Sequence, residues 1–354
     1  MYELFGIDPA QWVCTHLRAN EWEGFYRLRA EDGHRKVKLW QTRAIFKRVL
    51  DGLMEQQLAE WLKQHTKPLA AGRIRRLGKA EGPNVNIVWG FWDAHIGMHA
   101  WNQEVREDFS LGIAVNRCKN SVDDMVRRLE GKRIEAIHSP VGNDFMHFDS
   151  VRNTTTFGTH HLDCDSRYAK VYVAGLEVLI YMVERALQIA DRVVLYYVPG
   201  NHDYTTAFTM IAALNQRFIQ EPRVEVRMGA EPNKVITFGT TFIGLDHGNN
   251  VRDRMYETLF SSNPDTKQAW AMATWKEVQI GHTHQRKEHM FKGVTPCNGF
   301  LVRTNPSLSN VDYWHHSQAL TGEPVKSVEA WEYEDHGYVG SHVTWARDDE
   351  RPQG

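Results

Sequence analysis

From residue 85 onward, short apolar runs typical of buried strands alternate with amphipathic segments typical of helices. The strand-like runs cover residues 85–92, 134–141, 192–198, 276–280 and 298–304, and 234–246 has the pattern of a hairpin turning near Gly239. Helical periodicity is strongest over 167–190 and is present over 116–130. Alternating elements of this kind predict an α/β layered fold, with functional groups on loops that follow the strands.

The residues before this region follow a different pattern. Residues 24–40 alternate loosely around Asp32-Gly33, a dipeptide that favours a two-residue hairpin turn. Residues 41–64 carry apolar side chains at helical spacing, and 66–84 are rich in Gly, Pro and Arg, as expected of a linker or surface strap. We therefore predict an N-terminal hairpin-plus-helix appendage with its linker over 1–80, and one larger domain over 81–354.

Composition narrows the class of protein. The chain has 354 residues, of which 42% are apolar, so wholesale disorder is excluded. We expect no transmembrane helix and no signal peptide, because no long apolar run occurs and Met1–Asp8 lacks a basic start before an apolar stretch. The four Cys are widely spaced without a CxxC pair, which argues against a disulfide scaffold and favours a reducing, cytoplasmic location.

Five loops at predicted strand ends are rich in oxygen and imidazole groups. They are Asp93-Ala94-His95, Gly142-Asn143-Asp144, Gly200-Asn201-His202-Asp203, Asp246-His247-Gly248 and Gly281-His282-Thr283-His284. Each alone is typical of a solvated turn, but strand ends meet at one edge of a sheet, so together they predict a shared site. Carboxylate, amide oxygen and neutral imidazole suit divalent ions such as Mn, Fe or Zn, whereas the absence of Cys argues against structural zinc.

In order and spacing, these loops resemble the motifs of the calcineurin-like metallophosphoesterases over residues 93–284. The resemblance implies a four-layer α/β/β/α sandwich of two mixed sheets and makes 81–354 the catalytic domain. Residues 92–97 look like the first motif of the DNA-repair exonucleases of that superfamily, and 142–159 resemble phage- and prophage-encoded members. The chain departs from the usual pattern by the extra Asn143 before Asp144, and it lacks the Asp-Arg-Gly extension of the protein phosphatases.

The resemblance also implies roles for individual residues. One divalent ion would be held by Asp93, His95 and His284, the other by Asn201, His247 and His282, and Asp144 would bridge both. Mn is the first choice of metal, with Fe, Zn or Mg as alternatives. A hydroxide bound by the metals would attack phosphorus, His202 would stabilise or protonate the leaving oxygen, and Asp203 or Asp149 would orient His202. No substrate-binding residue is predicted.

The expected activity is hydrolysis of phosphodiester bonds, first of all in nucleic acid, so that DNA or RNA would be the partner of a nuclease. An alternative is a phosphodiesterase or phosphatase acting on small nucleotides. A third possibility, a non-catalytic binding module of the same fold, is disfavoured because every expected ligand and His202 are present. No prediction of oligomeric state, or of exo against endo action, follows from the sequence.

The N-terminal 80 residues carry fifteen Lys and Arg against nine Asp and Glu, and four Trp. Aromatic rings among basic side chains are able to stack on bases, and basic side chains contact phosphates. One hypothesis is therefore that this part grips a polyanion beside the active site. The competing hypothesis is that Ile45, Val49 and Leu53 dock a helix on the catalytic domain as structure.

Overall fold

A computed structural model describes residues 12–27, 34–48, 60, 63, 66–158, 161–282, 294–310 and 326–347. The chain divides into two units, Met1–Gln64 and His65–Gly354. The start of the second unit is a strap that lies on the rest of that unit. The backbone N of Leu69 donates to the carbonyl of Arg217 (2.7 Å), that of Leu77 donates to Gln188 (2.7 Å), and the Leu69 side chain is buried.

The first unit contains a long antiparallel hairpin. Strand β1 (Trp12–Arg27) pairs with β2 (His34–Arg48), from Trp12 opposite Arg48 to Arg27 opposite His34. The predicted hairpin is confirmed and is longer than expected. The predicted helix over 41–64 is wrong for 41–48, because those residues pair with β1, and the strand-favouring Thr42, Ile45 and Phe46 lie among them. Most of 49–64 lies outside the described residues.

The second unit contains two mixed sheets. The larger has the strand order β13-β12-β3-β4-β5-β6, in which β3 to β6 are parallel and β12 and β13 antiparallel. Its strands are β3 (Glu81–Trp89), β4 (Lys132–Gly142), β5 (Ala190–Val198), β6 (Val224–Arg227), β12 (Ser327–Glu334) and β13 (Gly337–Trp345). The smaller has the order β10-β11-β9-β8-β7. Its strands are β7 (Lys234–Phe238), β8 (Thr241–Leu245), β9 (Trp275–Ile280), β10 (Val294–Cys297) and β11 (Phe300–Thr304).

The hairpin predicted near Gly239 is confirmed as β7 and β8. Gly239 has φ +50°, and a Cβ there would lie 2.4 Å from the carbonyl oxygen of Asp335, so a side chain is excluded by the neighbouring turn.

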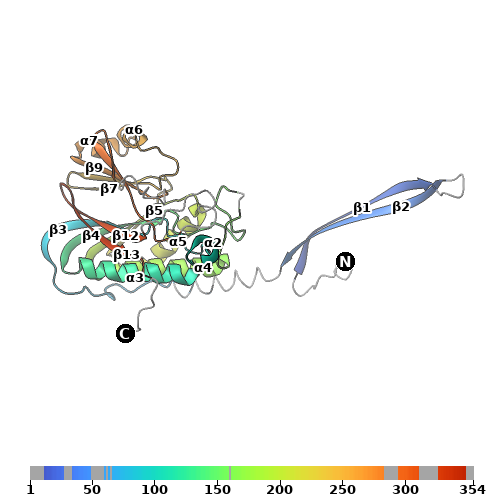
Figure 1. Cartoon of the computed structure of the whole chain (residues 1–354), viewed down its shortest axis with the longest axis horizontal. Coiled ribbons are helices and arrows are strands. Elements are labelled where there is room, and N and C mark those ends of the chain that lie inside the picture. Colours follow the sequence, from blue (N-terminus) through green and yellow to red (C-terminus); the bar gives the residue numbers. More distant parts are fainter. Residues whose placement is uncertain are drawn as a thin grey trace. The chain divides into compact units, whose positions relative to one another are not determined.

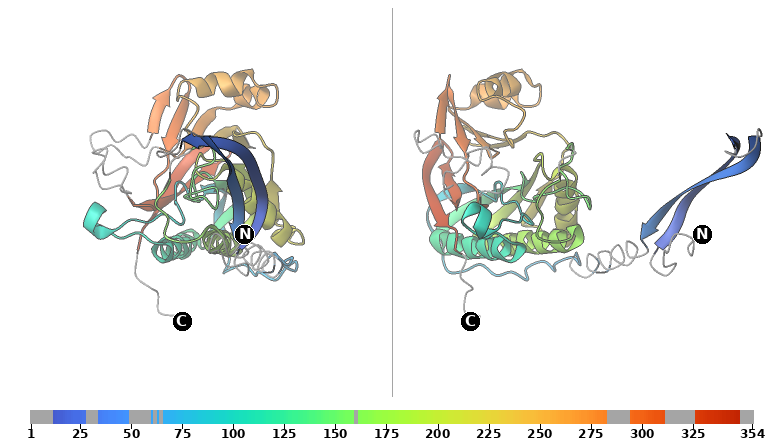
Figure 2. Two further views of the ribbon diagram at one scale, coloured as in Figure 1. Left: turned by 90° about the vertical axis from the view of Figure 1, so that its right-hand side faces the viewer. Right: turned by 45° about the vertical axis from the view of Figure 1, so that its right-hand side comes forward.

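Helices cover the outer faces of both sheets (Figures 1 and 2). The helices that pack on the larger sheet are α3 (Leu111–Leu129), α4 (Tyr168–Ala186) and α5 (Tyr204–Phe218). Those beside the smaller sheet are α6 (Met255–Ser262) and α7 (Lys267–Met272). Helix α2 (Asn102–Val105) is a single turn. Between the sheets, Tyr196 of the larger packs with Ile243 and Leu245 of the smaller. The predicted four-layer sandwich is therefore confirmed.

Among the helices of the described residues, none combines the length with the apolarity that a membrane span requires.

Candidate metal centre

The loops that follow β3 and β4 run side by side. The backbone N of Asp93 donates to the carbonyl of Asn143 (3.1 Å), and that of His95 donates to the carbonyl of Asp144 (3.1 Å). Both loops begin at the carboxyl ends of neighbouring parallel strands, and the carboxyl ends of parallel strands lie at the same edge of a sheet. The sheet thus places the first two predicted motifs within bonding distance of each other.

Asp203 holds the third loop against the second. Its buried carboxylate accepts hydrogen bonds from the backbone N of Gly200 (3.1 Å), Asp144 (3.2 Å) and Met146 (3.2 Å). Burial, together with the nearby charge of Asp144, raises the pKa of Asp203 to about 8. Asp203 is therefore a structural tie between the loops that follow β4 and β5.

Two groups of side chains have ligand atoms within 4.8 Å of one another, and they share Asp144. One consists of Asp93, His95 and Asp144, and the other of Asp144, His247 and His282. Asn201 lies beside the second group, with its Oδ1 atom 3.0 Å from Nε2 of His247. Every predicted metal ligand within the described residues is thus brought to one place; His284 lies outside them.

His247 shows why this donor set suits a cation. Its Nδ1 lies 2.8 Å from Oδ1 of Asn143, and its Nε2 lies 3.0 Å from both Oδ2 of Asp144 and Oδ1 of Asn201. Because an amide oxygen only accepts, Asn143 favours a proton on Nδ1, and a second proton on Nε2 would be shared with the oxygens of Asp144 and Asn201. A divalent ion would take the place of that proton, held by the Nε2 lone pair and the two oxygens. Asn143, the residue that departs from the usual motif, thus supports a predicted ligand.

The electrostatics agree with this reading. Burial raises the pKa of Asp93 to about 7, against the lowering effect of His247. Burial acts to lower the pKa of His247, but the adjoining Asp144 carboxylate raises it to about 9, and in turn His247 holds the pKa of Asp144 below its ordinary value although burial opposes this. The buried carboxylates therefore depend on a nearby positive charge.

Backbone conformation marks the same place. Of the seven described non-glycine residues with positive φ, five belong to these loops: Asp93 (49°), His95 (47°), Asn143 (64°), Asp144 (56°) and His282 (65°). Left-handed backbone costs about 1–3 kcal/mol for each such residue and persists where the surroundings impose it, most often at functional sites. The clustering therefore indicates a functional site independently of the ligand chemistry.

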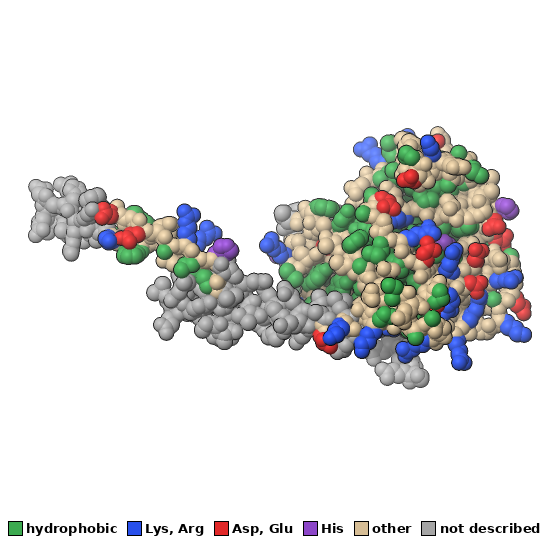
Figure 3. All heavy atoms as spheres, turned by 180° about the vertical axis from the view of Figure 1, so that it is seen from behind, with side chains coloured by type: hydrophobic (Ala, Val, Ile, Leu, Met, Phe, Trp, Pro, Cys, Tyr) green, Lys and Arg blue, Asp and Glu red, His purple; other side chains and the backbone are tan. Residues whose placement is uncertain are grey.

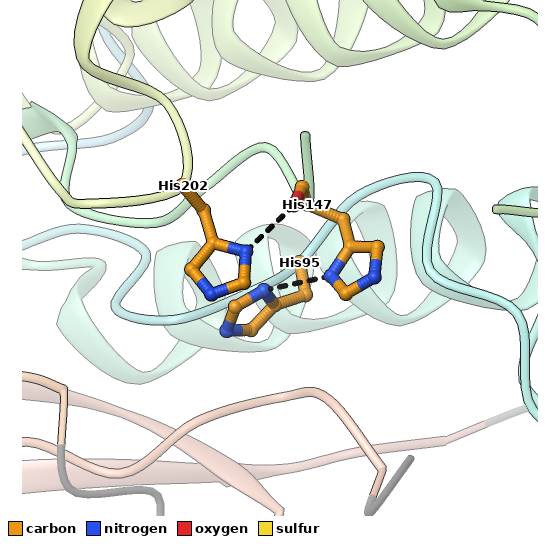
Figure 4. A group of neighbouring side chains, drawn as sticks. All are labelled: His95, His147 and His202. Carbon is orange, nitrogen blue, oxygen red and sulfur yellow. Dashed lines mark hydrogen bonds between the residues drawn. The ribbon is translucent and has the colours of Figure 1, made fainter. Parts of the chain in front are cut away.

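A third group consists of His95, His147 and His202, which come from the loops after β3, β4 and β5 (Figure 4). Nδ1 of His202 donates to the carbonyl oxygen of His147 (2.7 Å), and Nδ1 of His147 lies 3.2 Å from Nδ1 of His95. Because a carbonyl only accepts, the proton on Nδ1 of His202 is fixed, and Nε2 is left for chemistry. Our sequence analysis missed His147, although it follows Asp144 by three residues in the same loop.

The two carboxylates predicted to orient His202 bond elsewhere. Asp149 accepts from the backbone N of Thr205 (2.9 Å) and Thr206 (2.6 Å) and from the Thr206 hydroxyl (2.6 Å), and Asp203 ties the loops as described. The described hydrogen bond at Nδ1 of His202 goes to the His147 carbonyl instead. Asp203 or Asp149 was expected to orient the ring, but both carboxylates accept from backbone N–H groups instead.

Gly200 should be intolerant of any side chain. A Cβ there would lie 1.9 Å from Oδ1 and 2.4 Å from the backbone N of Asp144, so Gly200→Ala must displace the shared carboxylate or its loop. We expect the affinity for Mn²⁺ to fall by about 10- to 100-fold, as when a ligand's supporting partner is lost. Calorimetric titration measures this. Gly112→Ala, on α3 with its nearest atom at 3.9 Å, is the control, and an equal affinity in both variants would contradict the expectation.

Comparisons with known proteins add little to this geometry. No protein-family model matches the chain, and no curated protein matches it. Among solved structures, the chain is similar to one titled "Structure of PhoD", with a TM-score of 0.32 and 7% sequence identity, over 96% of this chain and 83% of that chain. A TM-score of 0.32 is too low to transfer the fold or activity of that protein to this chain.

Proposed function

We propose that this protein is a metal-dependent phosphoesterase that hydrolyses the phosphodiester bonds of nucleic acid with two divalent ions. The observation that carries the proposal is the pair of ligand groups sharing Asp144, with His202 beside them. Two cations held by one bridging carboxylate are the usual apparatus for displacement at phosphorus. The resemblance of the motifs over 93–284 to the metallophosphoesterases supports the same reading.

The residues that would hold the metals follow from the two groups. Asp93, His95 and Asp144 would hold one ion, with His284 as a further ligand, and Asp144, Asn201, His247 and His282 the other. Mixed oxygen and imidazole ligands without thiolate favour Mn, with Fe, Zn or Mg as alternatives to test. When bound, such ions polarise phosphoryl oxygens and make hydroxide available near neutral pH.

His202 would move a proton. The His147 carbonyl fixes Nδ1–H, so a protonated His202 presents Nε2–H as a donor. Its ring lies edge-on to that of His95, with centroids 4.8 Å apart, so the ring is held beside a residue that would bind one of the metals. We propose that His202 donates this proton to the leaving oxygen, as a general acid.

Two exposed aromatic rings near His202 would suit the base that nucleic acid carries beside its phosphate. Tyr204 follows His202 by two residues, and its ring centroid lies 5.8 Å from that of Phe157, which is 82% exposed. Two residues span at most about 7 Å, so a base next to the scissile phosphate is within reach of this pair. Stacking of a base on an aromatic side chain contributes about 1–3 kcal/mol.

A substrate panel tests the proposal. The chain is freed of metal with a chelator, reloaded with Mn²⁺, Fe²⁺, Zn²⁺ or Mg²⁺, and offered single-stranded DNA, duplex DNA, RNA, cyclic nucleotides, and aryl phosphate mono- and diesters. We expect metal-dependent hydrolysis of the aryl diester and of nucleic acid. Hydrolysis confined to cyclic nucleotides or monoesters would favour the small-nucleotide alternative, and binding without hydrolysis the non-catalytic one.

Phe157→Ala separates the substrates that carry a base from the aryl esters of this panel. Loss of stacking should lower action on nucleic acid by about 5- to 160-fold and leave the aryl diester unchanged. Met272→Ala removes a similarly exposed apolar side chain from α7 and is the control.

A further inference from the structure

The hairpin of β1 and β2 has two faces that differ in charge. Directly opposite residues of an antiparallel pair share a face, and successive residues alternate between faces. The described side chains of one face, named here the basic face, are His16, Arg18, Asn20, Trp22, Leu39, Gln41 and Arg43. Those of the other face are Leu17, Ala19, Glu21, Glu23, Lys38, Trp40, Thr42 and Ala44.

Two arginines stand opposite each other on the basic face. Arg18 pairs with Arg43 across the strands, and both side chains are exposed. On the other face, by contrast, Nζ of Lys38 lies 2.8 Å from a carboxylate oxygen of Glu21. Among the ribbon side chains that the structure describes, none on the basic face is acidic, and Figure 3 shows some of the ribbon's basic side chains away from its acidic ones and some beside them.

This arrangement calls for an anionic partner. Like charges directly opposite each other destabilise a strand pair, and a two-stranded hairpin on its own is only marginally stable in water. A polyanion bound along the basic face would turn the Arg18–Arg43 repulsion into two favourable contacts. Trp22 (46% exposed) and Leu39 (43% exposed), opposite each other on the same face, offer apolar surface beside the arginines.

Shape and chemistry select duplex DNA among polyanions. Paired strands lie about 4.8 Å apart, and the major groove of B-DNA, about 12 Å wide, admits a two-stranded ribbon. The major groove of an RNA duplex is too deep and narrow for side chains to read. Next to the arginines, Asn20 lies opposite Gln41, and these are the side chains whose amides pair with adenine in the major groove.

We propose that the basic face of the β1–β2 ribbon binds duplex DNA in the major groove, with Arg18 and Arg43 on phosphates. This inference rests on the proposed function only in that the DNA would also be the substrate. The ribbon is a second binding site on the chain, belonging to a different unit from the metal centre. Loss of ribbon binding should therefore leave the chemistry of the metal centre unchanged.

The test uses the full chain without metal, so that labelled duplexes stay intact. The affinity for a DNA duplex and for an RNA duplex of the same sequence is measured by fluorescence anisotropy over a range of salt concentrations. For the double variant Arg18→Gln, Arg43→Gln, the slope of log affinity against log salt should fall by about 2, because each phosphate contact contributes about 0.9. Lys38→Gln, which removes one positive charge from the other face, should leave the slope unchanged.

Arg18→Glu keeps the result interpretable if the ribbon's folding is affected. It replaces the repulsion with an opposite-charge pair, which should stabilise the ribbon, yet it should weaken DNA binding at least as much as Arg18→Gln. Unchanged salt slopes in both arginine variants would overturn the proposal, as would equal affinity for RNA. If the arginine variants still bound DNA but differed from the unmodified chain in molar mass by light scattering, the face would instead be an interface between copies of this chain. Aryl diester hydrolysis by the unmodified chain tests the metal centre separately.

Discussion

Replacing Asp144 with Asn is expected to remove metal binding and activity together. Asp144 belongs to both ligand groups, one of its oxygens accepts from the backbone N of His202 (2.7 Å), and the other faces His247 (3.0 Å). The amide keeps the shape of the side chain but removes the charge that the cations need. The loss of Mn²⁺ affinity should therefore exceed the roughly 10- to 100-fold effect of changing an outer partner.

Elemental analysis after dialysis against Mn²⁺, together with aryl diester hydrolysis, measures both effects. Asp123→Asn is the matched control: Asp123 bonds to Tyr181 (2.6 Å) and Arg185 (2.8 Å) between α3 and α4, and its loss should leave metal content unchanged. If the unmodified chain bound at most one ion at saturating Mn²⁺, or if Asp144→Asn retained two, the two-metal proposal would be wrong.

His202→Ala is expected to keep the metals while lowering turnover by about 10²- to 10⁴-fold, the usual contribution of a positioned acid. This corresponds to about 3–5 kcal/mol of transition-state stabilisation. The loss should be larger for poor leaving groups, such as a nucleoside oxygen, than for a nitrophenolate that departs without a proton. His336→Ala, in the exposed turn between β12 and β13, is the control and should keep full activity.

The rival role for His202 is that of a ligand, because it also forms a group with His95 and His147. A ligand predicts parallel losses of metal and turnover that do not depend on the leaving group. Metal content, measured beside a series of aryl diesters with graded leaving groups, separates the two roles. Loss of bound metal in His202→Ala would exclude the acid role proposed here.

The site could be predicted from the sequence because its groups follow strands. Val85–Trp92 and Ile134–Val141 are apolar runs whose ends must reach one sheet edge, so Asp93 and Asp144 were expected to meet. Periodicity does not show which polar group forms a hydrogen bond with which partner. Asp203 follows His202 directly and Asp149 precedes it in the loop after β4, but backbone N–H groups at the start of α5 and in the neighbouring loops take the oxygens of both carboxylates.

The same reasoning explains the wrong helix over 41–48. Ile45 and Val49 have helical spacing, yet a strand is favoured once residues 12–20 are available as a partner, and spacing alone gives no information about distant partners. His147 was missed for a similar reason. Its carbonyl accepts from His202 and its ring joins a group with His95 and His202, and neither contact follows from the periodicity of the sequence.

Because Asp144 belongs to both ligand groups, cations at the two groups would not bind independently. An ion bound to one carboxylate oxygen would change the negative charge on the other oxygen and so the affinity for a second ion. Linkage requires that the second ion change the affinity for the first by the same factor. Occupancy of the centre would then be a joint equilibrium, whose apparent constants belong to the pair of sites. The availability of one metal would in this way set the affinity for the other.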